Sequence, residues 1–150
     1  MNRLVRVAGE SMAPTYHSSD LLLTRPVGGA GVRRGDVAVF RRGGIGMIKR
    51  VVGLPGDLVE LEAGRLFVNG VPVDGRPRVP GAYTQTWRVP AESYFVAGDN
   101  SAVSDDSRVW EDPLVPAGKV AALVTRPLLG PRRPWGFKAG RRAAAAGRIA

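Results

Sequence analysis

The chain has 150 residues and a formal net charge of +9, with 20 glycines, 12 prolines and no cysteine. This length suits a single domain with a modest core, and the many turn residues favour a mainly β protein. The absence of cysteine excludes disulfides, thiol catalysis and a cysteine-based zinc site. The only histidine, His17, cannot build a metal cluster by itself, and we expect it in a solvated loop.

The first predicted strand, at residues 4–7, leads into a glycine-preceded turn that contains Ser11. Glycine permits sharply turned backbone that exposes a following hydroxyl, and Pro14 prevents a helix from continuing. A second strand over residues 21–23 ends at Pro26. Such a turn is usually a plain surface feature, so a chemical role for Ser11 depends on the later stretches.

A β-hairpin is predicted next, from residues 37–40 and 47–52. Strand alternation places Lys49 on the same face as the apolar side chains of Met47 and Val51. Such surroundings disfavour the ammonium ion, so we expect the pKa of Lys49 to lie well below the ~10.4 of a free lysine. A lysine that loses its proton in this way can serve as a base.

The composition of residues 54–57 predicts a turn, followed by strands at 58–61 and 66–68 and a tight reversal at Asn69 and Gly70. Together these elements predict a small β-meander.

After a loop at 74–82, strand character resumes at 84–89 and 93–97, and the last predicted strand covers 119–125. We therefore divide the chain into a β domain at residues 1–125 and a basic tail at residues 126–150.

A serine and a lysine together indicate nucleophilic chemistry. A serine hydroxyl is unreactive at neutral pH unless a base takes its proton. Because His17 lies outside every candidate motif, Lys49 is the best candidate base for Ser11. The stretch that begins at Gly98 is crowded with short hydrogen-bonding side chains that can orient the pair, which predicts a Ser-Lys acyl-transfer site.

Four stretches occur in the same order as the boxes of type I signal peptidases: residues 11–15, 35–36, 49–57 and 98–108. The chain resembles that family over about residues 5–124. The resemblance implies a serine endopeptidase that uses a Ser-Lys dyad to cleave signal (leader) peptides from precursor proteins. It also implies a coiled β-sheet or barrel core. The accessory β-region is expected to be minimal or absent, because the connection from the lysine to the last box is short for the family.

By this resemblance Ser11 is the nucleophile, Lys49 is the base, and Ser104 hydrogen-bonds the lysine. The oxyanion site should include the backbone N–H of Ser11. Some family members add a hydroxyl two residues before the nucleophile, where this chain has Gly9. We assign Gly9 and Met12, which flank Ser11 in the turn, to supporting positions.

The remaining polar residues of the last box are assigned to structure. Asp99, Asn100, Asp106 and Arg108 should hold the loop, because an arginine-carboxylate fork can tie down the segment that carries Ser104. We expect no metal and no cofactor. The expected partner is a precursor polypeptide bound as an extended strand.

Three alternatives remain open. A soluble maturation protease of the same clan fits the absence of any apolar stretch near ~20 residues, since family members usually carry a membrane anchor. The enzyme is thus expected to be membrane-associated by resemblance, or cytoplasmic if it is a maturation protease. A self-cleaving regulator fits less well, because only ten residues precede Ser11. A nucleic-acid-binding β-module lacks interleaved aromatic and basic residues, so nucleic acid is not an expected partner.

The tail at residues 126–150 carries seven basic side chains, and no acid follows Asp112. We expect it to be poorly ordered, with a short helix at most over residues 143–146. It is either a solvated segment or a peripheral contact with an anionic membrane surface.

Overall fold

The computed structural model describes residues 2–73 and 84–128. The predicted loop at 74–82, and the predicted tail beyond residue 128, lie outside the described residues. The described part is built of strands with one short 3-10 helix, which confirms the expected mainly β fold. The elements are β1 Arg3–Arg6, β2 Leu21–Arg25, β3 Val37–Arg42, β4 Ile45–Gly53, β5 Leu58–Glu62, β6 Arg65–Val68, β7 Val71–Pro72, β8 Thr84–Arg88, β9 Ser93–Ala97, β10 Leu114–Pro116, the 3-10 helix Ala117–Lys119 and β11 Val120–Pro127.

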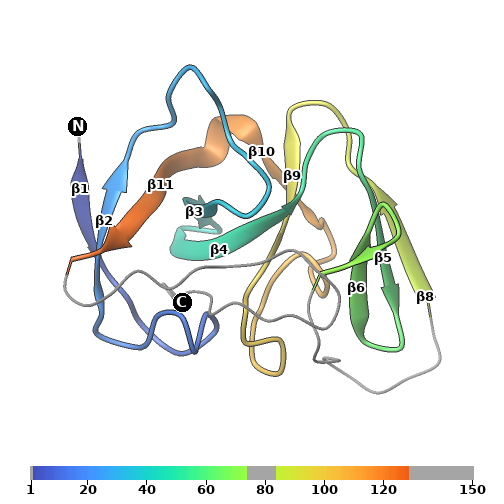
Figure 1. The fold of residues 1–150 in the computed structure, drawn as a ribbon, viewed down its shortest axis with the longest axis horizontal. Helices are drawn as coiled ribbons and strands as arrows, with labels where there is room; N and C mark the ends of the chain where they lie inside the picture. Colours follow the sequence, from blue (N-terminus) through green and yellow to red (C-terminus); the bar gives the residue numbers. More distant parts are fainter. Residues whose placement is uncertain (1, 74–83, 129–150) are drawn as a thin grey trace.

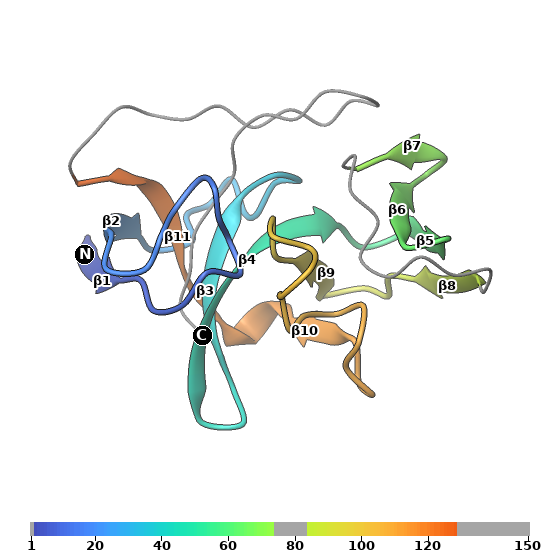
Figure 2. The ribbon, with the colours of Figure 1, turned by 90° about the horizontal axis from the view of Figure 1, so that it is seen from below.

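Seven strands form the larger sheet, in the order β1-β2-β11-β3-β4-β9-β10 (Figures 1 and 2). All of its pairings are antiparallel. The register shifts where β11 pairs with β2 and β3, and again where β4 pairs with β9. Such irregularities bend a strand and increase its twist, which explains the coiled form of the sheet.

The predicted β3–β4 hairpin is confirmed, with Ala38 opposite Lys49. The last predicted strand needs a correction. The strand predicted at 119–125 begins one residue later, because Lys119 belongs to the 3-10 helix. It continues to Pro127, two residues into the segment assigned to the tail. Strand β10 was not predicted at all.

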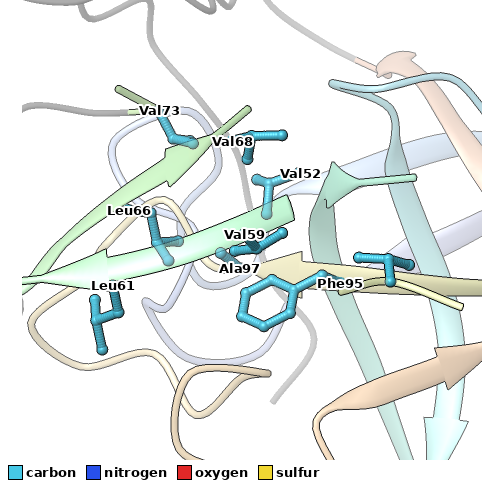
Figure 3. Packing of buried hydrophobic residues seen from close by; sticks show 9 residues of the cluster. Val52, Val59, Leu61, Leu66, Val68, Val73, Phe95 and Ala97 are labelled. Atoms are coloured by element: carbon cyan, nitrogen blue, oxygen red, sulfur yellow. The ribbon is translucent and has the colours of Figure 1, made fainter. Parts of the chain in front are cut away.

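The second sheet has four strands in the order β7-β6-β5-β8 and is the small accessory β-region, which is therefore present rather than absent. Its buried side chains pack against Phe95 and Ala97 of β9, as Figure 3 shows. At the end of β4 the two parts meet around Gly53, where an added Cβ would lie 2.9 Å from atoms of both Phe95 and Val59. The end of β4 therefore requires a residue without a side chain.

A polar contact also joins the two sheets, in the turn between β4 and β5. Asp57 accepts hydrogen bonds from Leu54 N, from Asn69 Nδ2 and, at 2.5 Å, from Arg34. Burial by itself raises the pKa of Asp57, but these donors and the charge of Arg34 outweigh it and hold the pKa below its ordinary value. The turn predicted at residues 54–57 is confirmed.

Among the described residues no helix has both the length and the apolar character needed to cross a membrane.

Candidate active site

The turn that carries Ser11 connects β1 to β2. Gly9 has φ 79°, a left-handed conformation that glycine adopts without the steric cost of a side chain. Met12 is fully buried and packs in a cluster with Val7, Leu22 and other apolar residues, so it anchors the turn to the larger sheet. Its supporting role is therefore in packing.

Lys49 reaches Ser11 from the middle of β4. Its Nζ lies 2.8 Å from Ser11 Oγ, within hydrogen-bond distance. The lysine side chain is 0% exposed and Ser11 is 5% exposed. Desolvation penalises the charged form of an amine in such a position. The two side chains, 38 residues apart in the sequence, are thus a preformed pair of hydroxyl and buried amine.

The surroundings of Lys49 follow the predicted alternation of β4. Met47 and Val51, on either side of it, belong to one buried apolar cluster together with Ala38 and Phe40. The intervening Ile48 belongs to a different cluster. Lys49 therefore enters an apolar layer, as the sequence predicted.

Arg50 forms a buried fork with Asp99 that the sequence analysis did not predict. Arg50 Nε and an Nη lie 3.1 and 2.8 Å from the two carboxylate oxygens, and its other Nη donates to the Gly35 carbonyl at 2.6 Å. The usable signal was an arginine inside an otherwise apolar strand, since a buried guanidinium needs a partner. Because Arg50 follows Lys49 directly, this fork ties the lysine's strand to the loop at 98–108.

Arg108 and Asp106 form the second fork, as predicted. Two guanidinium nitrogens of Arg108 lie 2.9 and 2.5 Å from the Asp106 carboxylate, and Gly98 N donates to the same carboxylate at 2.9 Å. Burial by itself raises the pKa of Asp106. The charge of Arg108 and the hydrogen bonds from Arg108, Ser104 and Gly98 N outweigh burial, so the pKa lies below its ordinary value of 3.8.

Ser104 is fully buried beside Gly98. A Cβ at Gly98 would lie 2.1 Å from Ser104 Oγ and 2.5 Å from the Ser11 carbonyl oxygen. The hydroxyl of Ser104 and the backbone of Ser11 therefore meet across a glycine that leaves no room for a side chain. The loop at 98–108 brings Ser104 next to the Ser11 turn.

Asn100 bonds the Ser11 turn directly. Its backbone N donates to the Ser11 carbonyl at 2.9 Å, and its side-chain Nδ2 donates to the Glu10 carbonyl at 3.0 Å. All the predicted site residues therefore gather around one turn and one loop. His17 lies apart on the exposed side of the turn, 3.1 Å from Glu10, in agreement with its expected solvated position.

This arrangement agrees with the comparisons with known proteins. The family model described as signal peptidase, peptidase S26, matches residues 2–129. Signal peptidase I of Pseudomonas aeruginosa is 31% identical over 83% of this chain and 61% of its own length. Signal peptidase IB of Staphylococcus aureus strain COL is 34% identical over 77% of this chain and 73% of its own length.

A crystal structure of a signal peptidase I from Enterococcus faecalis gives a similar picture. It is 30% identical, with a TM-score of 0.52, and the match covers 63% of this chain and 97% of that one. The chain spans less than two thirds of the length of several curated relatives, including those from Pseudomonas aeruginosa and Pseudomonas fluorescens. The extent of the family match nevertheless shows that this chain belongs to the peptidase S26 family of signal peptidases.

Proposed function

We propose that this chain is a serine endopeptidase that removes leader peptides from precursor proteins, with Ser11 as nucleophile and Lys49 as general base. The 2.8 Å contact between Lys49 Nζ and Ser11 Oγ carries the proposal, because a nucleophile and its base must lie within hydrogen-bond reach. Family membership supports the reaction class.

The charges around the pair favour an amine that can act as a base. A carboxylate near a lysine favours the ammonium form. The two buried carboxylates of the loop, Asp99 and Asp106, are each paired with an arginine, which weakens their pull on the proton of Lys49. Burial then favours the neutral amine.

In the proposed reaction, neutral Lys49 takes the Ser11 proton as Oγ attacks the scissile carbonyl. The resulting ammonium gives that proton to the leaving amine, and the leader segment remains as an acyl ester on Ser11. Lys49 next takes a proton from water, whose oxygen attacks the ester. The ammonium then returns that proton to Ser11 Oγ as the ester bond breaks, which restores the hydroxyl and the neutral amine. Ser104 is proposed to orient the amine, which its position beside the Ser11 turn supports.

The oxyanion site in this proposal is the backbone N–H of Ser11. That N–H donates no hydrogen bond to another described residue, so it is available for a developing negative charge. Gly9 supplies no hydroxyl at the position where some family members have one. The precursor would bind as an extended strand.

The experiment is incubation with a panel of precursor proteins, followed by sequencing of the new N-termini. We expect a single cleavage per precursor, at the end of its leader segment, and no cleavage by Ser11→Ala. Cleavage of only one precursor in the panel would favour a maturation protease with a dedicated substrate over a general signal peptidase. Products that persist in Ser11→Ala would contradict the assignment of the nucleophile.

A further inference from the structure

We infer that Asn100 is a positioning residue that aims the Ser11 N–H at the oxyanion, an inference that rests on the function proposed above. Asn100 contacts the carbonyl groups on both sides of Ser11. Its Nδ2 donates to the Glu10 carbonyl at 3.0 Å, and its backbone N donates to the Ser11 carbonyl at 2.9 Å.

The planarity of the peptide bond turns the first contact into control of the oxyanion donor. The Glu10 carbonyl and the Ser11 N–H belong to the same peptide unit, and in a trans peptide they point in opposite directions. A donor that holds the carbonyl oxygen therefore also fixes the direction of the N–H. Ala13 N donates to the same oxygen at 3.1 Å, so the plane is held from two sides.

The second contact fixes the peptide plane that follows Ser11. With both planes held, the Cα of Ser11 and the direction of its side chain are set as well. Asn100 is itself held in place, because its carbonyl accepts from Val103 N and Ser104 N at 3.1 and 3.0 Å. Its neighbour Asp99 is clamped by Arg50, the residue next to Lys49.

The pair Asp99 and Asn100 thus connects the strand of the base to the turn of the nucleophile. Only the side-chain bond of Asn100 can be removed by substitution, since its backbone N–H stays in any variant except proline. An oxyanion donor must be preorganised to act, and loss of one such donor lowers kcat by about 10²–10³. Misalignment of a donor that remains present should have a smaller effect.

The test compares Asn100→Ala and Asn100→Asp with the wild-type chain and with Asn69→Gly. Asn69 makes two side-chain bonds away from the Ser11 turn: its Nδ2 donates to Asp57 and its Oδ1 accepts from Leu58 N, each at 2.9 Å. Its φ of 51° suits glycine, so the control loses both bonds without backbone strain. The substrate is a soluble peptide that spans a cleavage site found with the precursor panel.

We expect kcat to fall about 10- to 100-fold in both Asn100 variants, with KM changed less than about threefold. The midpoint of the pH–rate profile should stay at its wild-type value in Asn100→Ala, because this change adds no charge near Lys49. A kcat within about twofold of wild type in both variants would overturn the inference. Loss of the fold in both would also overturn it, because Asn100 would then be a structural residue.

An amide ¹⁵N NMR spectrum provides a second readout that does not need cleavage. The Ser11 amide resonance should broaden or split in Asn100→Ala and stay sharp in Asn69→Gly. An unchanged Ser11 resonance in Asn100→Ala would refute the inference even if cleavage were reduced. If the Ser11 resonance responds to Asn100→Ala as expected but the wild-type chain cleaves no precursor, the proposed function is refuted and the positioning role of Asn100 is not.

Discussion

At the scale of single residues, the proposed mechanism makes cleavage depend on the charge of one amine, that of Lys49, which contacts Ser11. The rate should rise with pH as Lys49 loses its proton, with a midpoint below ~10.4, the pKa of a free lysine. Lys49→Arg keeps a positive charge at every accessible pH and should be inactive. Initial rates between mildly acidic and alkaline pH measure this, and a flat profile would exclude Lys49 as the titrating base.

Arg108 should act through stability, because it neutralises the buried carboxylate of Asp106. Removing one partner of a buried pair typically costs about 3–5 kcal/mol. Arg108→Ala should lower the free energy of unfolding by an amount of that order, as measured by urea unfolding at neutral pH. The matched variant Arg34→Ala breaks a more exposed pair with Asp57, whose arginine is 34% exposed, and should cost about 1 kcal/mol or less. Equal losses in the two variants would contradict this ranking.

The same carboxylate gives the stability a pH dependence. Because the pKa of Asp106 is lower in the folded chain than in the unfolded one, its contribution is present above the unfolded pKa. It is lost as the pH falls toward and through the folded value, since the unfolded chain then binds more protons. The wild-type chain should therefore lose stability as the pH falls below 3.8, the ordinary pKa of Asp106. Arg108→Ala should lose less stability over the same pH range. A parallel acid loss in both would contradict the assignment to Asp106.

At the scale of elements, the close approach of the loop at 98–108 to the Ser11 turn depends on Gly98. Gly98→Ala would place a methyl group 2.1 Å from Ser104 Oγ and 2.5 Å from the Ser11 carbonyl, so one of the two segments must move. Displacement of that size should lower cleavage by about 10²-fold or more. Gly118→Ala meets no atom within 4 Å and should keep full activity. Peptide cleavage rates for the two variants, with melting temperatures, provide the measurement.

The elements that the sequence predicted correctly depend on neighbouring residues. The β3–β4 hairpin and the burial of Lys49 follow from local alternation, and the order of the motifs gives the family. Strand β10 was missed because Leu114–Pro116 lies among prolines, which usually exclude a strand. Proline is tolerated on an edge strand, and β10 is the edge of its sheet.

The partner of Arg50 could not be predicted for a different reason. Arg50 and Asp99 are 49 residues apart, and several carboxylates of the chain were equally plausible partners before the strands were placed. The spacing of the last box likewise does not reveal that Gly98 must lack a side chain. Contacts between distant segments depend on the register of β4 with β9, which is shifted by an irregularity between Val51 and Gly53.

At the scale of the whole molecule, we propose the hypothesis that the basic tail holds the enzyme at an anionic membrane surface. Each basic side chain near an anionic membrane contributes about 1 kcal/mol of attraction. Because β11 extends to Pro127, the cut should follow Leu128, which removes six basic side chains and no acid. The shortened chain should lose its binding to anionic vesicles in a sedimentation assay and still cleave a soluble peptide. Salt should weaken binding of the intact chain, and equal binding by both chains would end the hypothesis.

The strand order also determines when the chain becomes a protease during its synthesis. Strand β2, which follows the Ser11 turn, pairs only with β1 and with β11, the last strand of the described part. The Thr125 hydroxyl of β11 donates to the Leu23 carbonyl, 102 residues earlier. We therefore expect the sheet beside the Ser11 turn to be complete only after the ribosome has released β11. We expect a nascent chain without β11 to cleave no neighbouring polypeptide, and activity should return on refolding with the last, slowest phase.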